Sequence, residues 1–155
     1  MRLIIVLKNI NKLYMNIIYE NTINTQYIQA STYFVVNNQF VKDKNIIQNE
    51  PIFSFKHQFK KHFSIMLIDL QTSFLHWWVS NIDLENEYKE IWINYFSPFL
   101  DEHTYVFYIF YQPFFIDKPE YINPFKFRDK FKVKEYCAKF NLKLINTKYF
   151  ILNTL

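Results

Sequence analysis

The sequence predicts a mainly β domain, either a sandwich or a barrel, with one short helix near its end. Three observations lead to this fold class. Of the 155 residues, 50% are hydrophobic and 21% are aromatic, which is enough apolar material for the core of one domain. Short runs rich in β-branched and aromatic residues recur between Asn, Asp, Glu and Pro residues, as in a series of strands. One later stretch has helical periodicity instead.

Each of these elements can be placed along the chain. The expected strands cover residues 31–41, 51–57, 62–70, 74–82, 103–113 and 147–152. The helix is expected around Val133, Tyr136, Cys137 and Phe140, which follow the i, i+3, i+4 and i+7 spacing of one apolar face. Three prolines and polar spacers make residues 112–127 a long connection. Strands at this spacing favour a sandwich or a barrel.

The composition is unusual because the chain contains no glycine. Its turns must therefore be made by Asn, Asp and Pro, the other residues that tolerate or fix turn geometry. Alanine and arginine occur twice each, against 16 lysines, and Ile, Phe, Tyr and Asn are abundant. Such a bias toward A+T-rich codons is common in organelles and in some protists.

Several classes of protein are disfavoured by what the sequence lacks. Without a Gly-rich loop, P-loop and Rossmann phosphate sites are excluded. The four histidines, which show neither metalloprotease nor zinc-site spacing, are His57, His62, His76 and His103. We therefore expect no enzyme, no metal and no cofactor. The single cysteine, Cys137, excludes an internal disulfide, and the longest apolar run, residues 105–111, is too short to span a bilayer.

Charge is segregated along the chain, although the formal net charge is only +4. Residues 1–68 carry eight basic and three acidic side chains, residues 69–117 carry one and eight, and residues 118–148 carry nine and three. The basic flanks indicate either contact with a polyanion or a solvated lysine-rich surface. The first residues contain Arg2, Lys8 and Lys12 but no acid before Glu20, as in a mitochondrial targeting peptide. We expect a retained extension or synthesis inside the organelle.

Three stretches resemble the phosphatidylethanolamine-binding protein (PEBP) family. The family's first signature is an Asp-Pro-Asp-x-Pro turn, then a strand with His-Trp and a closing Asn-Ile; it is similar to IDLQTSFLHWWVSNI. The second, Gly-x-His-Arg before a hydrophobic strand ending near Gln, is similar to LDEHTYVFYIFYQP. A third, Arg and Lys-Phe before a short helix and the last strand, is similar to FRDKFKVKEYCAKFNLKL.

The resemblance implies a PEBP-like, two-sheet antiparallel β-sandwich of Greek-key type with a short C-terminal helix. It covers residues 50–155, and residues 1–49 are expected to form an N-terminal extension with the first strand or strands. The implied small-anion pocket consists of Asp69, His76, His103 and Tyr105. Imidazole and phenol groups can donate hydrogen bonds to a phosphate oxygen while a carboxylate orients one imidazole. His76 would point into this pocket, and Trp77 would pack on the opposite face of the strand.

The same stretches depart from the family pattern at the rim of the pocket. The turn is Asp69-Leu70-Gln71, so its second carboxylate and its prolines are missing, and Thr104 stands in place of the signature arginine. The pocket is therefore expected either to bind a phosphate headgroup or other small anion, or to be vestigial.

One branch of the family is a protein of the large subunit of the mitochondrial ribosome. The stretch NYFSPFLDEHTYVFYIFYQPFFID is similar to that branch, through Pro98-Phe99 and Ile116-Asp117. We therefore expect a non-catalytic structural subunit in the mitochondrial matrix that contacts rRNA and ribosomal proteins. The candidate RNA contacts are Arg128, Lys130, Lys132 and Lys134. The alternatives are a phosphate-headgroup or small-anion binding protein, and a scaffold subunit of another organellar complex.

Overall fold

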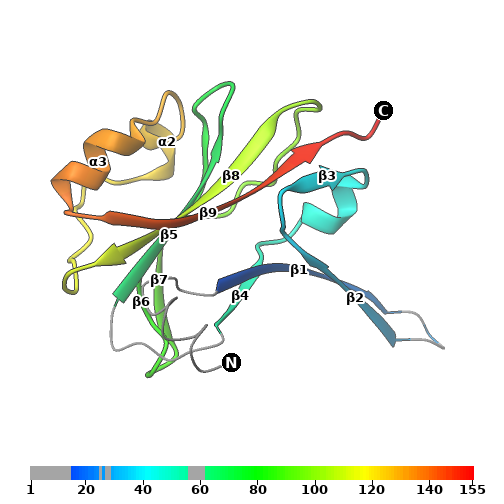
Figure 1. Cartoon of the computed structure of the whole chain (residues 1–155), viewed down its shortest axis with the longest axis horizontal. Helices are drawn as coiled ribbons and strands as arrows, with labels where there is room; N and C mark the ends of the chain where they lie inside the picture. Colours follow the sequence, from blue (N-terminus) through cyan, green and yellow to red (C-terminus); the bar gives the residue numbers. More distant parts are fainter. Residues whose placement is uncertain (1–14, 25, 27–28, 56–61) are drawn as a thin grey trace, which may run out of the picture.

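The computed structural model describes residues 15–24, 26, 29–55 and 62–155, which form two β-sheets and a helical layer (Figure 1). The basic N-terminal stretch and His57 lie outside the described residues. The strands are β1 Met15–Asn24, β2 Gln29–Val35, β3 Gln39–Val41, β4 Ile52–Phe55, β5 His62–Asp69, β6 Leu75–Asp83, β7 Tyr88–Ile93, β8 Thr104–Gln112 and β9 Lys143–Leu152. The helices are the 3-10 helix η1 Lys44–Ile47 and the α-helices α2 Pro124–Phe127 and α3 Val133–Lys139.

The larger sheet has six strands in the order β3-β9-β8-β5-β6-β7. Strands β5, β6 and β7 follow one another as hairpins, and β8 returns to lie beside β5, which is a Greek-key arrangement. All neighbouring pairs are antiparallel except β3 and β9, which are parallel. The smaller sheet is antiparallel, with the order β2-β1-β4. The predicted fold class, a mainly β two-sheet sandwich with a short helix near the end, is confirmed.

The main core lies between the two sheets. The smaller sheet contributes Ile17 and Tyr19 from β1, both fully buried. The larger sheet contributes alternate residues of its strands, such as Leu67, Trp77 and Phe107. A buried side chain of this size removes about 150 Å² or more of surface from water, so these aromatic residues hold the sheets together.

A second core lies on the other face of the larger sheet, beneath α2 and α3 (Figure 1). Here Trp78 packs against Phe131 at 5.5 Å and against Tyr136 at 5.8 Å between ring centroids. Strands β5 and β6 are therefore covered on both faces and are almost completely buried. This explains why their sequences are continuous apolar runs without alternating polar residues.

The predicted elements agree with the structure to different degrees. The strands expected at 62–70, 74–82 and 103–113 correspond closely to β5, β6 and β8, and the predicted helical face corresponds to α3. The run 31–41 forms two strands instead of one, because the chain turns at Asn38, which has a φ of 56°. Strands β1 and β7 were not predicted. No described helix is long and apolar enough to cross a bilayer.

The turns of this glycine-free chain place ordinary residues in the left-handed region. Seven described residues have a positive φ, between 49° and 64°: Asn38, Ser73, Asn81, Glu87, Glu102, Lys130 and Asn141. Three of them are asparagines, as the composition predicts, because Asn tolerates this region better than most residues. The remaining four carry the conformational cost that glycine would avoid.

Candidate functional site

The four residues of the predicted pocket lie at one end of the larger sheet. Asp69 is the last residue of β5, and it pairs with Tyr105 at the beginning of β8. His76 is the second residue of β6, and His103 immediately precedes β8. Because β5 ends where its neighbours β6 and β8 begin, the topology brings these four side chains to the same edge.

Asp69 and His103 form a direct pair. The Nδ1–H of His103 donates to the carboxylate Oδ2 of Asp69 at 2.7 Å. The other carboxylate oxygen, Oδ1, accepts from the backbone N–H groups of Gln71 and Thr72. Asp69 is buried, whereas the side chain of His103 is 24% exposed. The carboxylate therefore fixes the imidazole so that its Nε2 is the nitrogen available to a ligand.

The turn after β5 lacks the signature prolines and is held by hydrogen bonds. In addition to the Asp69 bonds, the side-chain oxygen of Gln71 accepts from the N–H of Thr104 at 2.9 Å, which joins the turn to β8. Ser73 takes the left-handed conformation, with a φ of 58°. Gln71 and Thr104, which replace signature residues, thus hold the rim of the site through hydrogen bonds of their own.

His76 reaches the site because β6 contains a β-bulge. Leu67 of β5 pairs with Trp77, but the next residue of β5, Ile68, pairs with Leu75, so His76 has no partner in that register. A bulge of this kind re-aims a side chain. The His76 ring lies 5.3 Å from Tyr105, and the Trp77 ring lies 6.4 Å from Phe107. Tyr105 and Phe107 are two residues apart on β8, so both point into the core between the two sheets. His76 and Trp77 therefore lie on the same face of β6, and the prediction that Trp77 packs on the opposite face is wrong.

The imidazole of His76 is buried and neutral at physiological pH. Its Nδ1–H donates to the carbonyl oxygen of Phe96 at 2.6 Å. Burial lowers the pKa of His76 to about 4, although the Phe96 bond and the nearby Asp69 act in the opposite direction. In this state the Nε2 of His76 is a hydrogen-bond acceptor, not a donor to an anion.

The hydroxyl group of Tyr105 is occupied within the chain. It donates to the carbonyl oxygen of Leu100 and accepts from the N–H of the same residue, both at 2.9 Å. Burial raises the pKa of this phenol to about 12. Tyr105 therefore anchors the segment before β8 and has no remaining proton to donate to a phosphate oxygen.

Arg128 closes the site from the side of the helical layer, and sequence reasoning missed this role. Its Nη1 donates to the carbonyl oxygens of Leu75 at 3.0 Å and His76 at 3.1 Å, and its Nη2 donates to that of Asn94 at 2.6 Å. The guanidinium lies over the rings of Phe74 and Phe96, at 5.9 and 5.5 Å. The signal available in the sequence was Phe74, an aromatic residue just before His76 and Trp77, because an arginine is attracted to the face of such a ring.

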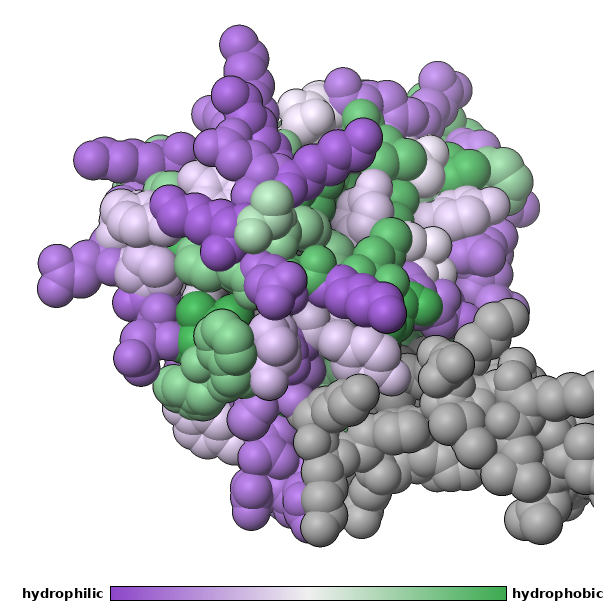
Figure 2. All heavy atoms as spheres, turned by 60° about the vertical axis from the view of Figure 1, so that its left-hand side comes forward, coloured by the Kyte–Doolittle hydropathy of each residue, from purple (hydrophilic) through white to green (hydrophobic). Residues whose placement is uncertain are grey.

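The other three candidate RNA contacts are placed differently from Arg128. Lys130, Lys132 and Lys134 are exposed on and beside the loop between α2 and α3. Within the part of the chain that the structure describes, no ion pair joins them to a carboxylate. The face that carries the helices has many projecting hydrophilic side chains with apolar surface between them (Figure 2). These lysines are therefore free to meet a polyanion.

The site offers few polar groups to a ligand. Its free polar atoms are the Nε2 of His103, supported by Asp69, and the Nε2 of the neutral His76. A protonated His103 could donate one charge-assisted hydrogen bond to an anion. Among the described residues, no group of three or more His, Cys, Asp or Glu side chains could hold a metal ion.

Comparison with known proteins identifies the fold. No protein-family model and no curated protein matches the sequence. A solved carboxypeptidase Y inhibitor, complexed with its cognate proteinase, is 17% identical and has a TM-score of 0.65, covering 93% of this chain and 84% of that one. A phosphatidylethanolamine-binding protein from Plasmodium vivax is 12% identical, with a TM-score of 0.61, covering 92% of this chain and 86% of that one. Its counterpart from Plasmodium falciparum is 13% identical, with a TM-score of 0.53 and the same coverage.

The chain therefore has the fold of the phosphatidylethanolamine-binding proteins. The two sheets and the Greek-key order agree with the fold that the resemblance in the sequence implies. At these identities the likeness concerns the fold alone.

Proposed function

We propose that this chain is a non-catalytic structural subunit of the large subunit of the mitochondrial ribosome, built on a degenerate PEBP-like fold. One observation carries the proposal: the polar groups of the expected anion pocket are largely used by the protein itself. Tyr105 binds Leu100, and the Nδ1 of His76 binds Phe96. A pocket whose donors stabilise the fold favours a structural role.

The surface supports contact with RNA. Lys130, Lys132 and Lys134 present three positive charges close together, and each phosphate that they neutralise would release bound counterions. The glycine-free, lysine-rich composition supports an organellar origin, and the similarity of Pro98-Phe99 and Ile116-Asp117 to the ribosomal branch supports this particular assembly. The carboxypeptidase Y inhibitor, which has this fold, is complexed with its cognate proteinase, so the fold can serve in contacts between macromolecules.

Sedimentation of the tagged, full-length chain tests this proposal. It should comigrate with the large ribosomal subunit in the mitochondrial matrix fraction, and RNase should release it. Charge reversal at Lys130, Lys132 or Lys134 should weaken this association and reduce its dependence on salt, whereas Lys42→Glu, beyond β3, is the matched control. Comigration with a membrane complex, insensitive to RNase, would reject the ribosomal assignment and favour a scaffold in another organellar assembly.

A second function, binding of a phosphate headgroup or small anion, is favoured by the Asp69–His103 pair. The imidazole of His103 is oriented by the carboxylate through Nδ1, and its side chain is partly exposed. Phosphate at ten times its Kd would raise the free energy of unfolding by about 1.4 kcal/mol. Thermal unfolding at 10 mM phosphate, against 10 mM chloride, measures this effect. His103→Asn should abolish it, because the amide can keep the Asp69 bond but lacks Nε2. An unchanged melting temperature in the native chain would rule out millimolar affinity.

A further inference from the structure

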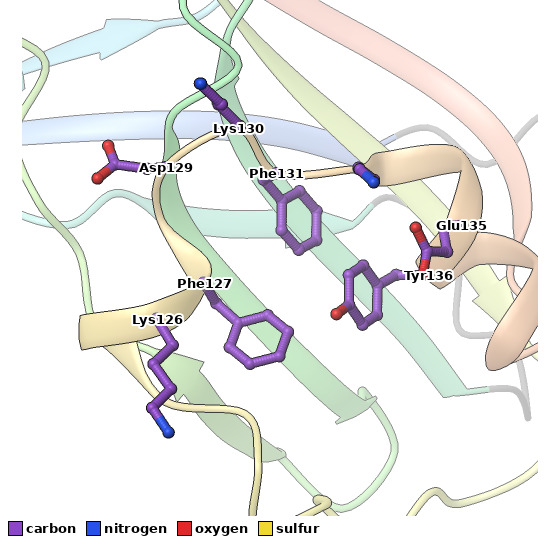
Figure 3. A pocket seen from close by; sticks show the side chains of 8 residues that line it. Lys126, Phe127, Asp129, Lys130, Phe131, Glu135 and Tyr136 are labelled. Carbon is purple, nitrogen blue, oxygen red and sulfur yellow. The ribbon is translucent and has the colours of Figure 1, made fainter.

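A hollow of about 360 Å³ lies between α2 and α3 (Figure 3), and none of the four histidine-site residues lines it. It is lined by Lys126, Phe127, Asp129, Lys130, Phe131, Lys132, Glu135 and Tyr136. The rings of Phe127, Phe131 and Tyr136 lie in the gap between the two helices, and Asp129 projects from the connecting loop away from these rings (Figure 3). The hollow thus has an aromatic floor and a charged rim.

The floor is fixed by ring contacts. Phe131 and Tyr136 are stacked at 5.0 Å between centroids with an interplanar angle of 9°, and Phe127 meets Tyr136 edge-on at 5.4 Å. Phe131 also packs on Trp78 of the larger sheet. The shape therefore depends on the core beneath α3, so the hollow is held by packed residues and not by the loop alone.

The rim combines both signs of charge. Lys126, Lys130 and Lys132 are exposed, and among the described residues none of them has a carboxylate partner within ion-pair distance. The carboxylate of Glu135 lies beside Tyr136 (Figure 3). Phe125, next to Lys126 in the sequence, is 98% exposed. The face of this ring is therefore accessible to a planar ligand.

We infer that this hollow receives an unstacked base of a single-stranded RNA segment. The inference rests on the proposed function and specifies the RNA contact. The ring of Phe125 would stack on a neighbouring base, because every base presents a π face. Lys126, Lys130 and Lys132 would contact the phosphates on either side. The Glu135 carboxylate would accept a hydrogen bond from the exocyclic amino group of the inserted base, which favours cytosine over uracil.

An acidic peptide is the competing occupant, since it would also be attracted by the three lysines. The carboxylates of Asp129 and Glu135 in the lining would repel it. A base has no formal charge and carries both donors and acceptors, so it matches a lining of mixed sign. The aromatic floor and the exposed Phe125 ring also favour a planar ligand over an aspartate or glutamate side chain.

Fluorescence anisotropy with the full-length chain tests the inference. The probes are labelled oligo(C) and oligo(U) of about 12 nucleotides, a typical length for single-strand binding sites. We expect tighter binding of oligo(C). Phe125→Ala should weaken binding of both RNAs about tenfold through the loss of stacking. Lys130→Gln should lower the slope of log K against log salt by about 0.7, whereas Lys42→Gln should leave affinity and slope unchanged.

Glu135→Gln separates base recognition from general electrostatics. Loss of a negative charge near the phosphates should strengthen binding of oligo(U). The amide keeps one acceptor oxygen but adds a donor that suits the O4 of uracil, so the preference for oligo(C) should fall. An equal gain for both RNAs, or no effect of Phe125→Ala, would overturn the insertion of a base. Equal binding of poly-glutamate would favour an acidic peptide instead and would also overturn it.

The outcomes distinguish this inference from the proposed function. Comigration with the large ribosomal subunit together with no affinity for either RNA would leave the structural role intact and reject the hollow as an RNA site. RNA affinity that depends on Phe125 and Glu135, without comigration, would support the hollow and reject the ribosomal assignment.

Discussion

Arg128 provides the sharpest test of the structure, because a single side chain joins three segments. Its guanidinium donates to the carbonyl oxygens of Leu75, His76 and Asn94. The bond to Asn94 is exposed to solvent, so we count the two partly buried hydrogen bonds. A hydrogen bond to a charged group contributes about 1.5–3 kcal/mol, which gives at least about 3 kcal/mol for Arg128. The contacts with the rings of Phe74 and Phe96 add to this value.

Replacement by methionine removes the hydrogen bonds but keeps much of the apolar stem. We expect Arg128→Met to lower the free energy of unfolding by about 3 kcal/mol, measured by urea denaturation with tryptophan fluorescence. Arg128→Lys should recover less than half of this loss, because an ammonium group cannot span carbonyl groups on both sides. Lys126→Met, at an exposed position on the neighbouring helix, is the control and should change stability by less than about 0.5 kcal/mol.

The result that would refute this reasoning is a small effect of Arg128→Met. A change within about 0.5 kcal/mol would mean that solvent competes successfully for the three carbonyl groups. If stability is unaffected while RNA affinity falls, Arg128 faces a ligand and not the protein. The fraction of folded protein must therefore be measured in every binding assay with this variant.

Three further predictions concern the site and the turns. Because the pKa of His76 falls from 6.5 to about 4 on folding, the folded state binds fewer protons, and about 3 kcal/mol of stability should be lost as the pH falls from 6.5 to 4. His76→Asn, which can keep the bond to Phe96, should flatten this part of the stability profile; an equally steep profile would assign it to another group. Glu87→Gly together with Glu102→Gly should raise the free energy of unfolding by about 1 kcal/mol in total, seen as a higher urea midpoint, because both residues have positive φ. A lower midpoint would show that these turns are not strained. Asn81→Ala should lower the free energy of unfolding by about 3 kcal/mol or more, because the buried amide of Asn81 forms hydrogen bonds with Glu90 of β7 and with Ile116 of the connection after β8. A loss below about 1 kcal/mol would contradict that network.

The central strands could be predicted from the sequence, whereas the outer ones could not. Strands β5, β6 and β8 are apolar enough to be recognised individually, because both faces of the sheet are covered. Strand β7 contains Lys89 and Glu90, and its charges hide the buried pair Trp92 and Ile93. The parallel pairing of β3 with β9 depends on contacts between residues more than 100 positions apart, which no local pattern records.

The candidate site shows the same limit. Its four members could be predicted from motifs because the chain order of Asp69, His76, His103 and Tyr105 is preserved. What could not be predicted is how each side chain is used. The bulge that turns His76 appears only when the register of β5 and β6 is known. The three carbonyl groups that bind Arg128 come from segments far from it in the sequence.

The position of β9 has a consequence for biosynthesis. This strand is the last in the described chain, yet it lies inside the larger sheet, between β3 and β8. Until it emerges from the translation machinery, β8 has an open edge and β3 has no neighbour in the sheet. A nascent chain that lacks β9 would present that unpaired edge to other chains, a known risk for aggregation. Closure of the larger sheet must therefore wait until β9 has been synthesised.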